Sequence, residues 1–144
     1  MIKTFRGLMT DETQDTIVLH TNDGSVGYKV VKFQIINNTP GVGAVKGIVK
    51  IYKISQTTPD AVIDFSDNTL LAAAYYEDND SVTYVHGKTI IFDREIFNQD
   101  IYVTYSDKQG SEPMNYYIEL EQVKLDLSEN TVATLKDIRN KHNV

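Results

Sequence analysis

The fold is decided by the stretch Asp100-Ile-Tyr-Val-Thr-Tyr-Ser106 and by the run Asn115-Tyr-Tyr-Ile-Glu-Leu-Glu121, which follows it after a polar turn. In both segments, apolar or aromatic side chains recur at every second position. This alternation of aromatic and β-branched residues is typical of a half-buried antiparallel strand. We therefore predict two strands here, paired as a hairpin that carries Tyr102 and Tyr117.

Similar patterns extend outward from this pair. Short apolar or alternating runs between turn residues predict further strands at Thr16–His20, Tyr28–Ile36, Gly47–Ile54, Ala61–Phe65 and Thr89–Asp93. In the second of these, Val31, Phe33 and Ile35 form the expected core face. Gly47–Ile54 is apolar on both faces, as expected for a strand between two layers or at an interface.

Other segments need a choice between structures. Leu70–Glu77 contains three alanines, which favour a helix, but its tyrosines and β-rich surroundings favour a strand, and we predict a strand. The strand from Asn115 continues to Leu127 with a change of phase, for which a β-bulge near Glu121-Gln122 would account. Residues 128–141 have an N-cap serine and helical spacing, so we predict a C-terminal helix. Residues 1–10 are expected to form an N-terminal arm or an edge strand.

Composition places these elements in one domain. The chain has 144 residues, of which 41% are hydrophobic and 24% charged, as is typical of a globular domain with its own core. Strands separated by turns every 8–12 residues or so predict an all-β fold. We expect one antiparallel β-sandwich over residues 1–144, with jelly-roll or Greek-key connections and a short C-terminal helix.

Charge and cysteine content exclude several classes of function. The formal net charge is −6, with acidic residues scattered along the chain, whereas a protein that holds nucleic-acid phosphates needs clustered Lys and Arg. The absence of cysteine excludes disulfides, cysteine-bound metal centres and cysteine nucleophiles. No apolar run has the length of a signal peptide or a membrane span. We expect no nucleic acid and no membrane as partners, and a protein that stays in the cytoplasm in which it is made.

No group of residues predicts catalysis, a cofactor or a metal site. The histidines are His20, His86 and His142. They lie far apart without a second ligand at metal spacing, so we interpret them as solvated residues of loops or strand ends. Asp78-Asn-Asp80 and the group Asp60, Asp64 and Asp67 lack the spacing of a calcium loop, and we interpret both as polar turns. We therefore do not expect an enzyme.

The candidate binding residues are mainly tyrosines. Tyr102, Tyr105, Tyr116 and Tyr117 crowd the predicted hairpin and occupy both of its faces, so core packing and an exposed surface are both open for them. Tyrosine is enriched at protein–protein interfaces, and its ring also suits carbohydrate platforms. The predicted interface comprises Tyr52, Tyr102, Tyr105 and Tyr117, together with Val132, Leu135 and Ile138 of the predicted C-terminal helix.

Several segments resemble a group of small structural proteins of tailed phages that infect marine bacteria, including cyanobacteria. The segments are Asp11–His20, Phe65–Ala74, Gly87–Asp93, Phe97–Tyr105, Asn115–Gln122 and Thr131–Arg139. This resemblance implies a non-enzymatic component of the virion. Small β-sandwiches serve in phages as head decoration or cement proteins, as connector or neck proteins, and as tail or fibre adaptors.

Within this setting, we expect a capsid decoration protein that binds the head surface. Its expected partners are the major capsid protein or other virion subunits, and its expected state is a homo-oligomer. A neck or tail adaptor is the alternative in the same virion setting. A carbohydrate-binding module that uses exposed tyrosines is the alternative of a different class.

Overall fold

Eight strands make up the described part of the chain. The computed structural model describes residues 1–22, 24–78, 86–92 and 95–125. The strands are β1 (Ile2–Met9), β2 (Thr13–Ile17), β3 (Val26–Asn37), β4 (Val45–Tyr52), β5 (Leu70–Asp78), β6 (His86–Ile91), β7 (Ile101–Asp107) and β8 (Met114–Lys124). The predicted all-β class is confirmed, since the described residues contain no helix. The predicted helix at 128–141, with Val132, Leu135 and Ile138, lies outside the described residues.

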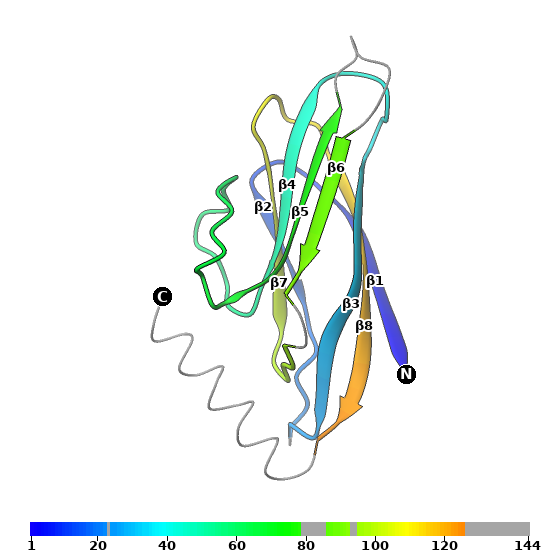
Figure 1. The fold of residues 1–144 in the computed structure, drawn as a ribbon, viewed down its shortest axis with the longest axis vertical. Coiled ribbons are helices and arrows are strands. Elements are labelled where there is room, and N and C mark those ends of the chain that lie inside the picture. Colours follow the sequence, from blue (N-terminus) through cyan, green and yellow to red (C-terminus); the bar gives the residue numbers. More distant parts are fainter. Residues whose placement is uncertain (23, 79–85, 93–94, 126–144) are drawn as a thin grey trace.

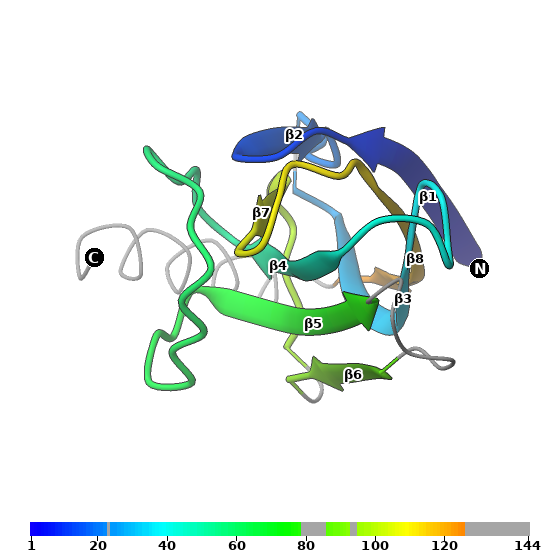
Figure 2. The ribbon, with the colours of Figure 1, turned by 90° about the horizontal axis from the view of Figure 1, so that it is seen from above.

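The strands form two antiparallel sheets, consistent with the predicted sandwich (Figure 1). One sheet has three strands in the order β1-β8-β3, and the other has five in the order β2-β7-β4-β5-β6. Figure 2 shows both sheets from above, with β1 near β2 and β3 near β5. Among the described residues, the N-terminal strand β1 pairs with β8 alone, so it is an edge strand.

Side chains from both sheets meet in one hydrophobic core. Among its completely buried members are Val49, Ile51, Ile101, Val103, Ile118 and Leu120. They lie at every second position of β4, β7 and β8, as the alternation predicts. Burying one such aliphatic side chain stabilises the folded state by roughly 1.5–3 kcal/mol. The apolar residues at alternate positions of these three strands therefore supply much of the core.

Two strand predictions for the five-stranded sheet are confirmed. The strand β4 is buried on both faces, as its apolar residues predicted. The segment Leu70–Glu77 is a strand and not a helix. Ala72 and Ala74 of this strand pair with β4 on one side and β6 on the other. Tertiary pairing on both sides thus outweighs the helix propensity of alanine.

The predicted hairpin and the predicted bulge are wrong. The strands β7 and β8 belong to different sheets, so the turn between them carries the chain from one sheet to the other. Pairing of β8 with both neighbours is continuous along β8, and the register shift lies in β3 between Val30 and Lys32. Val31 is the extra residue there and is 39% exposed, although we expected it in the core. The extra residue of a bulge interrupts the regular alternation between core-facing and solvent-facing side chains, so its side chain need not face the core.

The segment Ala61–Phe65 is also not a strand. It belongs to a long loop between β4 and β5 and pairs with no strand within the described residues. Its alternating sequence has the strand pattern, but a strand needs a neighbouring edge with free backbone groups. Here both long sides of β4 and β5 are already occupied.

Candidate functional site

The predicted interface tyrosines are separated by the fold. Tyr105 is completely buried, and its hydroxyl donates a hydrogen bond to the backbone carbonyl of Glu112. Burial, together with nearby carboxylates, raises the pKa of Tyr105. Tyr52 is only 7% exposed, and the Lys50 ammonium lies 5.3 Å from the centre of its ring. The interface prediction is therefore wrong for Tyr105 and Tyr52, because both side chains are enclosed within the chain.

The other two predicted tyrosines reach the surface on different sheets. Tyr102 is partly exposed on β7 and lies between Thr16 and Tyr52 in the register of the five-stranded sheet. Tyr117 lies on β8, the central strand of the three-stranded sheet, and faces away from the core residues Tyr116 and Ile118. A binding role for both stays a prediction.

Tyr117 lies in a groove of about 510 Å³ on the outer face of the three-stranded sheet. We call it the Tyr117 groove; it is lined mainly by Arg6 and Leu8 of β1, Gln34 and Ile36 of β3, and Asn115 and Tyr117 of β8. The register explains this grouping. Arg6 and Gln34 both pair with Tyr117, whereas Leu8 and Ile36 both pair with Asn115. Two adjacent rows of three side chains thus form the groove.

The groove offers apolar surface beside the positive charge of Arg6. Leu8 and Ile36 are 52% and 55% exposed. Within the described residues, Arg6 takes part in no ion pair. The Tyr117 hydroxyl donates a hydrogen bond to the Glu119 carboxylate at 2.7 Å, which raises the pKa of Tyr117. The groove can therefore hold an apolar group that has an acidic neighbour.

Most of this groove could not be predicted from the sequence. Along the chain, Tyr117 lies about 110 residues from Arg6 and Leu8 and about 80 residues from Ile36. The pairing of β1 and β3 with β8 brings these side chains together. One signal in the sequence was useful. Tyr116 and Tyr117 are adjacent in β8, so their side chains must point to opposite faces of the sheet, and one of them is a surface tyrosine.

A second exposed apolar surface lies on the loop between β4 and β5. Val62 is 65% exposed, Ile63 39% and Phe65 59%. We call these three side chains the loop tip. In Figures 1 and 2, this green loop lies on the side of the molecule opposite to β1. Large apolar side chains gathered on one exposed loop are typical of a contact surface.

A buried lysine anchors this loop. Only 2% of the Lys50 side chain is exposed, and its ammonium donates hydrogen bonds to Asp60 Oδ1 at 2.8 Å and to the Val62 carbonyl at 2.5 Å. The hydrogen bond from Lys50 lowers the pKa of Asp60. A buried ammonium needs such partners because an unpaired charge in the interior is costly.

Short-range turns make the loop rigid further along. Asp64 Oδ1 accepts hydrogen bonds from the amide and the hydroxyl of Ser66, at 2.9 and 2.6 Å. Asp67 Oδ1 does the same with Thr69, at 2.9 and 2.6 Å. The Phe65 ring meets the Phe92 ring edge-on, with centroids 5.1 Å apart. These bonds confirm the interpretation of Asp64 and Asp67 as residues of polar turns. Asp60, the third aspartate of this group, is the ion-pair partner of Lys50.

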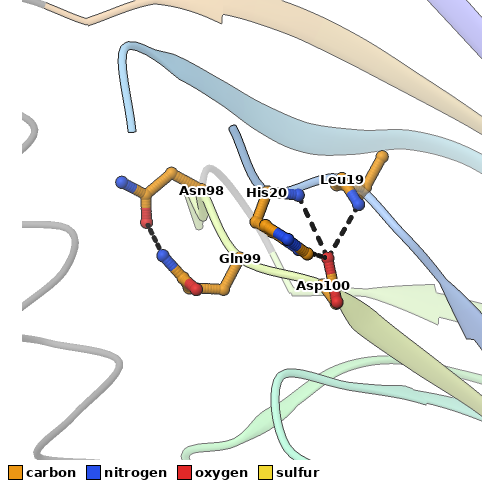
Figure 3. A network of polar contacts seen from close by, with 5 residues as sticks. All are labelled: Leu19, His20, Asn98, Gln99 and Asp100. Carbon is orange, nitrogen blue, oxygen red and sulfur yellow. Dashed lines mark hydrogen bonds and ion pairs between the residues drawn. The ribbon is translucent and has the colours of Figure 1, made fainter. Parts of the chain in front are cut away.

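Figure 3 shows a polar network at the start of β7. Asp100 Oδ1 accepts hydrogen bonds from the backbone amides of Leu19 and His20 and lies 2.7 Å from His20 Nδ1. Burial alone would raise the pKa of Asp100, but these hydrogen bonds outweigh it and lower the pKa. Nearby, the Gln99 amide donates to Asn98 Oδ1 at 3.5 Å. The network fixes the chain after β2 against the start of β7, a role for His20 that the sequence did not predict.

Two other kinds of site are absent from the part of the chain that the structure describes. Within the described ranges, no three His, Asp or Glu side chains lie close enough together to hold a metal ion. The described part of the chain also has no helix of the length and apolarity needed to cross a membrane.

Comparisons with known proteins show a distant similarity to a solved structure. No protein-family model matches the chain, and no curated protein matches it. Among solved structures, the chain is similar to a tailspike protein of Acinetobacter baumannii bacteriophage Fri1, a capsular polysaccharide depolymerase. The identity is 7% and the TM-score 0.16, and the match covers 77% of this chain and 21% of the tailspike. The chain thus spans about a fifth of that protein, and a similarity this low carries no argument about fold or function.

Proposed function

We propose that this chain is a non-enzymatic structural protein of a tailed-phage virion, and that it decorates the capsid. The observation that carries the proposal is the pair of exposed apolar surfaces, the Tyr117 groove and the loop tip, on opposite sides of one rigid core. Contiguous exposed apolar surface on a small domain is typical of a contact with other subunits. The sequence resemblance to phage structural proteins supports the virion setting.

We also propose the finer architecture that this role requires. The order of strands in both sheets supports Greek-key or jelly-roll connections, because β8 lies between β1 and β3, and β7 lies between β2 and β4. In the proposal, residues 128–141 form a helix, and Val132, Leu135 and Ile138 give it an apolar face. Such a face packs on the sandwich or on a neighbouring subunit.

The proposed partner is the major capsid protein or another virion subunit. A mass-spectrometric inventory of purified virions, with copy numbers, tests the proposal. Hundreds of copies support decoration of the head, whereas about six or twelve copies indicate a neck or tail adaptor. Virions without the protein would overturn both forms of the proposal.

A carbohydrate-binding module is the second candidate. The observation that favours it is the Tyr117 ring beside the polar side chains of Arg6, Gln34 and Asn115 in one groove, since sugars stack on aromatic rings and bond to such groups. A glycan array followed by calorimetry tests it. Binding that is lost in Tyr117→Ala and kept in Tyr102→Ala supports this candidate, and no binding to any glycan excludes it.

A further inference from the structure

We propose that copies of this chain associate head to tail, with the loop tip of one copy seated in the Tyr117 groove of the next. The proposal goes beyond the virion role, because it concerns the contact between copies and holds for the free protein in solution. It joins the two exposed surfaces that the fold presents but does not bring together within one chain.

The two surfaces match in apolar character. The loop tip presents one aromatic and two aliphatic side chains, and the most exposed are Val62 and Phe65. The groove presents Leu8 and Ile36 on either side of the β8 backbone, in one row of the sheet. Its volume of about 510 Å³ lies within the range of roughly 300–1,000 Å³ typical of pockets for small ligands. One aromatic side chain and a neighbouring aliphatic one therefore fit the groove.

The two surfaces also match in charge. Asp64 is an exposed carboxylate next to Phe65 in the loop, whereas the charge of Asp60 is already balanced by Lys50. Arg6 supplies a guanidinium at the groove that has no ion pair within the described residues. Because Asp64 adjoins Phe65 in the chain, a contact that seats Phe65 in the groove brings this carboxylate and the Arg6 guanidinium into the same interface. An exposed pair of this kind contributes more to orientation and association rate than to affinity.

The loop is held in place before it binds. Lys50 fixes its first part through Asp60 and the Val62 carbonyl, and Asp64 and Asp67 cap the turns that follow. A contact that uses a preordered loop loses little conformational entropy on association. This distinguishes the loop tip from the scattered apolar side chains found on any protein surface.

The position of the two surfaces sets the symmetry of the assembly. The loop and the strand β1 lie on opposite sides of the molecule in Figures 1 and 2. One pair of copies therefore cannot form two such contacts at the same time, as a two-fold dimer would require. The contact is heterologous, and its repetition gives a ring or a row of copies. A single contact is smaller than a standard interface, so we expect dissociation constants of about a micromolar or weaker.

Sedimentation velocity of the full-length chain over a range of concentrations tests the association. We expect species larger than a monomer to grow with concentration. The double variant Val62→Ser/Phe65→Ser keeps the groove but has no apolar loop tip, and Leu8→Ser/Ile36→Ser keeps the tip but has a weakened groove. Each should raise the dissociation constant at least about tenfold. Val18→Ser, at a 67% exposed site outside both surfaces, is the matched control and should associate like the wild type.

Mixing the two double variants gives the decisive result. Each retains one working surface, so an equimolar mixture should form a heterodimer and nothing larger at concentrations where neither variant associates measurably alone. If two copies instead met through the same surface about a two-fold axis, mixing the two variants would not restore association. The proposal is overturned if the wild type stays monomeric throughout, if either double variant still associates like the wild type, or if the mixture forms no dimer. Unchanged thermal melting of each variant verifies that these exposed substitutions leave the fold intact, and virion inventories test the proposed function separately.

Discussion

The ammonium of Lys50 lies 2.8 Å from Asp60 Oδ1, and the two side chains differ sharply in exposure, at 2% and 58%. The lysine comes from the centre of the five-stranded sheet, and the aspartate comes from the loop that covers it. Because only one partner is buried, loss of one charge has a different consequence from loss of the other.

We predict that Asp60→Ala destabilises the protein more than Lys50→Met. The first change leaves a buried ammonium without its carboxylate, which costs about 2–4 kcal/mol, whereas the second leaves a carboxylate that water can solvate and costs about 1 kcal/mol or less. Urea denaturation of the two variants measures the difference. Equal losses, or the reverse order, would contradict the asymmetry.

A second prediction concerns acid stability. The pKa of Asp100 is lowered in the folded protein, so its contribution to stability is complete above the pKa of an unfolded aspartate, about 3.9. This contribution is lost as the pH falls through the lower, folded value. Denaturation midpoints measured between pH 6 and pH 3, for example, should fall less in Asp100→Asn than in the wild type. A parallel fall in both proteins would show that Asp100 does not contribute.

Alkaline titration gives a third prediction. Burial raises the pKa of Tyr105 and of Tyr116, and carboxylates near each ring add to the effect. Their neutral forms stabilise the fold fully below the unfolded pKa of about 10, and this contribution is lost as the pH rises toward the folded values. Ultraviolet absorbance should show two tyrosines that ionise only when the protein unfolds. Tyr116→Phe should leave one, whereas Tyr117→Phe should leave both.

The fourth prediction contrasts two glycines in strands. A Cβ atom at Gly47 would lie 2.5 Å from Met114 Cε and 3.0 Å from Tyr105 Cε1, and both neighbours are completely buried. Gly47→Ala should therefore cost about 1–3 kcal/mol, because overpacking forces buried side chains to shift. At Gly87, the nearest atom is 3.5 Å away, and Gly87→Ala should be neutral or slightly stabilising. Thermal unfolding of the two variants measures this contrast.

Alternation in the sequence predicted which segments are strands more successfully than it predicted which strands are neighbours. The segments around Tyr105 and Ile118 are strands with the expected core faces, because period 2 reports directly which side chains can be buried together. Their partners could not be predicted, because the same alternation fits a hairpin and a crossover between sheets. The segment at Val62 shows the opposite error, in which a strand pattern lies in a loop without a pairing edge.

The candidate surfaces could be predicted only in part. The exposed position of Tyr117 can be read from the alternation, because Tyr117 lies one residue away from the core residues of its strand. Tyr105 was wrongly grouped with it, although Tyr105 lies two residues from Val103 and therefore faces the core with it. The remainder of the groove depends on the register of β1 and β3 with β8. Register is fixed by long-range packing, which a single sequence does not reveal.

The bulge at Val31 has a consequence for how copies can meet. It interrupts the ladder of β3, which is an edge strand of the three-stranded sheet, and the lysines Lys29 and Lys32 lie close on either side. Bulges and lysines on an outer strand discourage backbone pairing with another molecule, the first step of amyloid-like growth. The free border of β3 is thereby protected against backbone pairing with another copy, which leaves side-chain surfaces as the places where copies can meet.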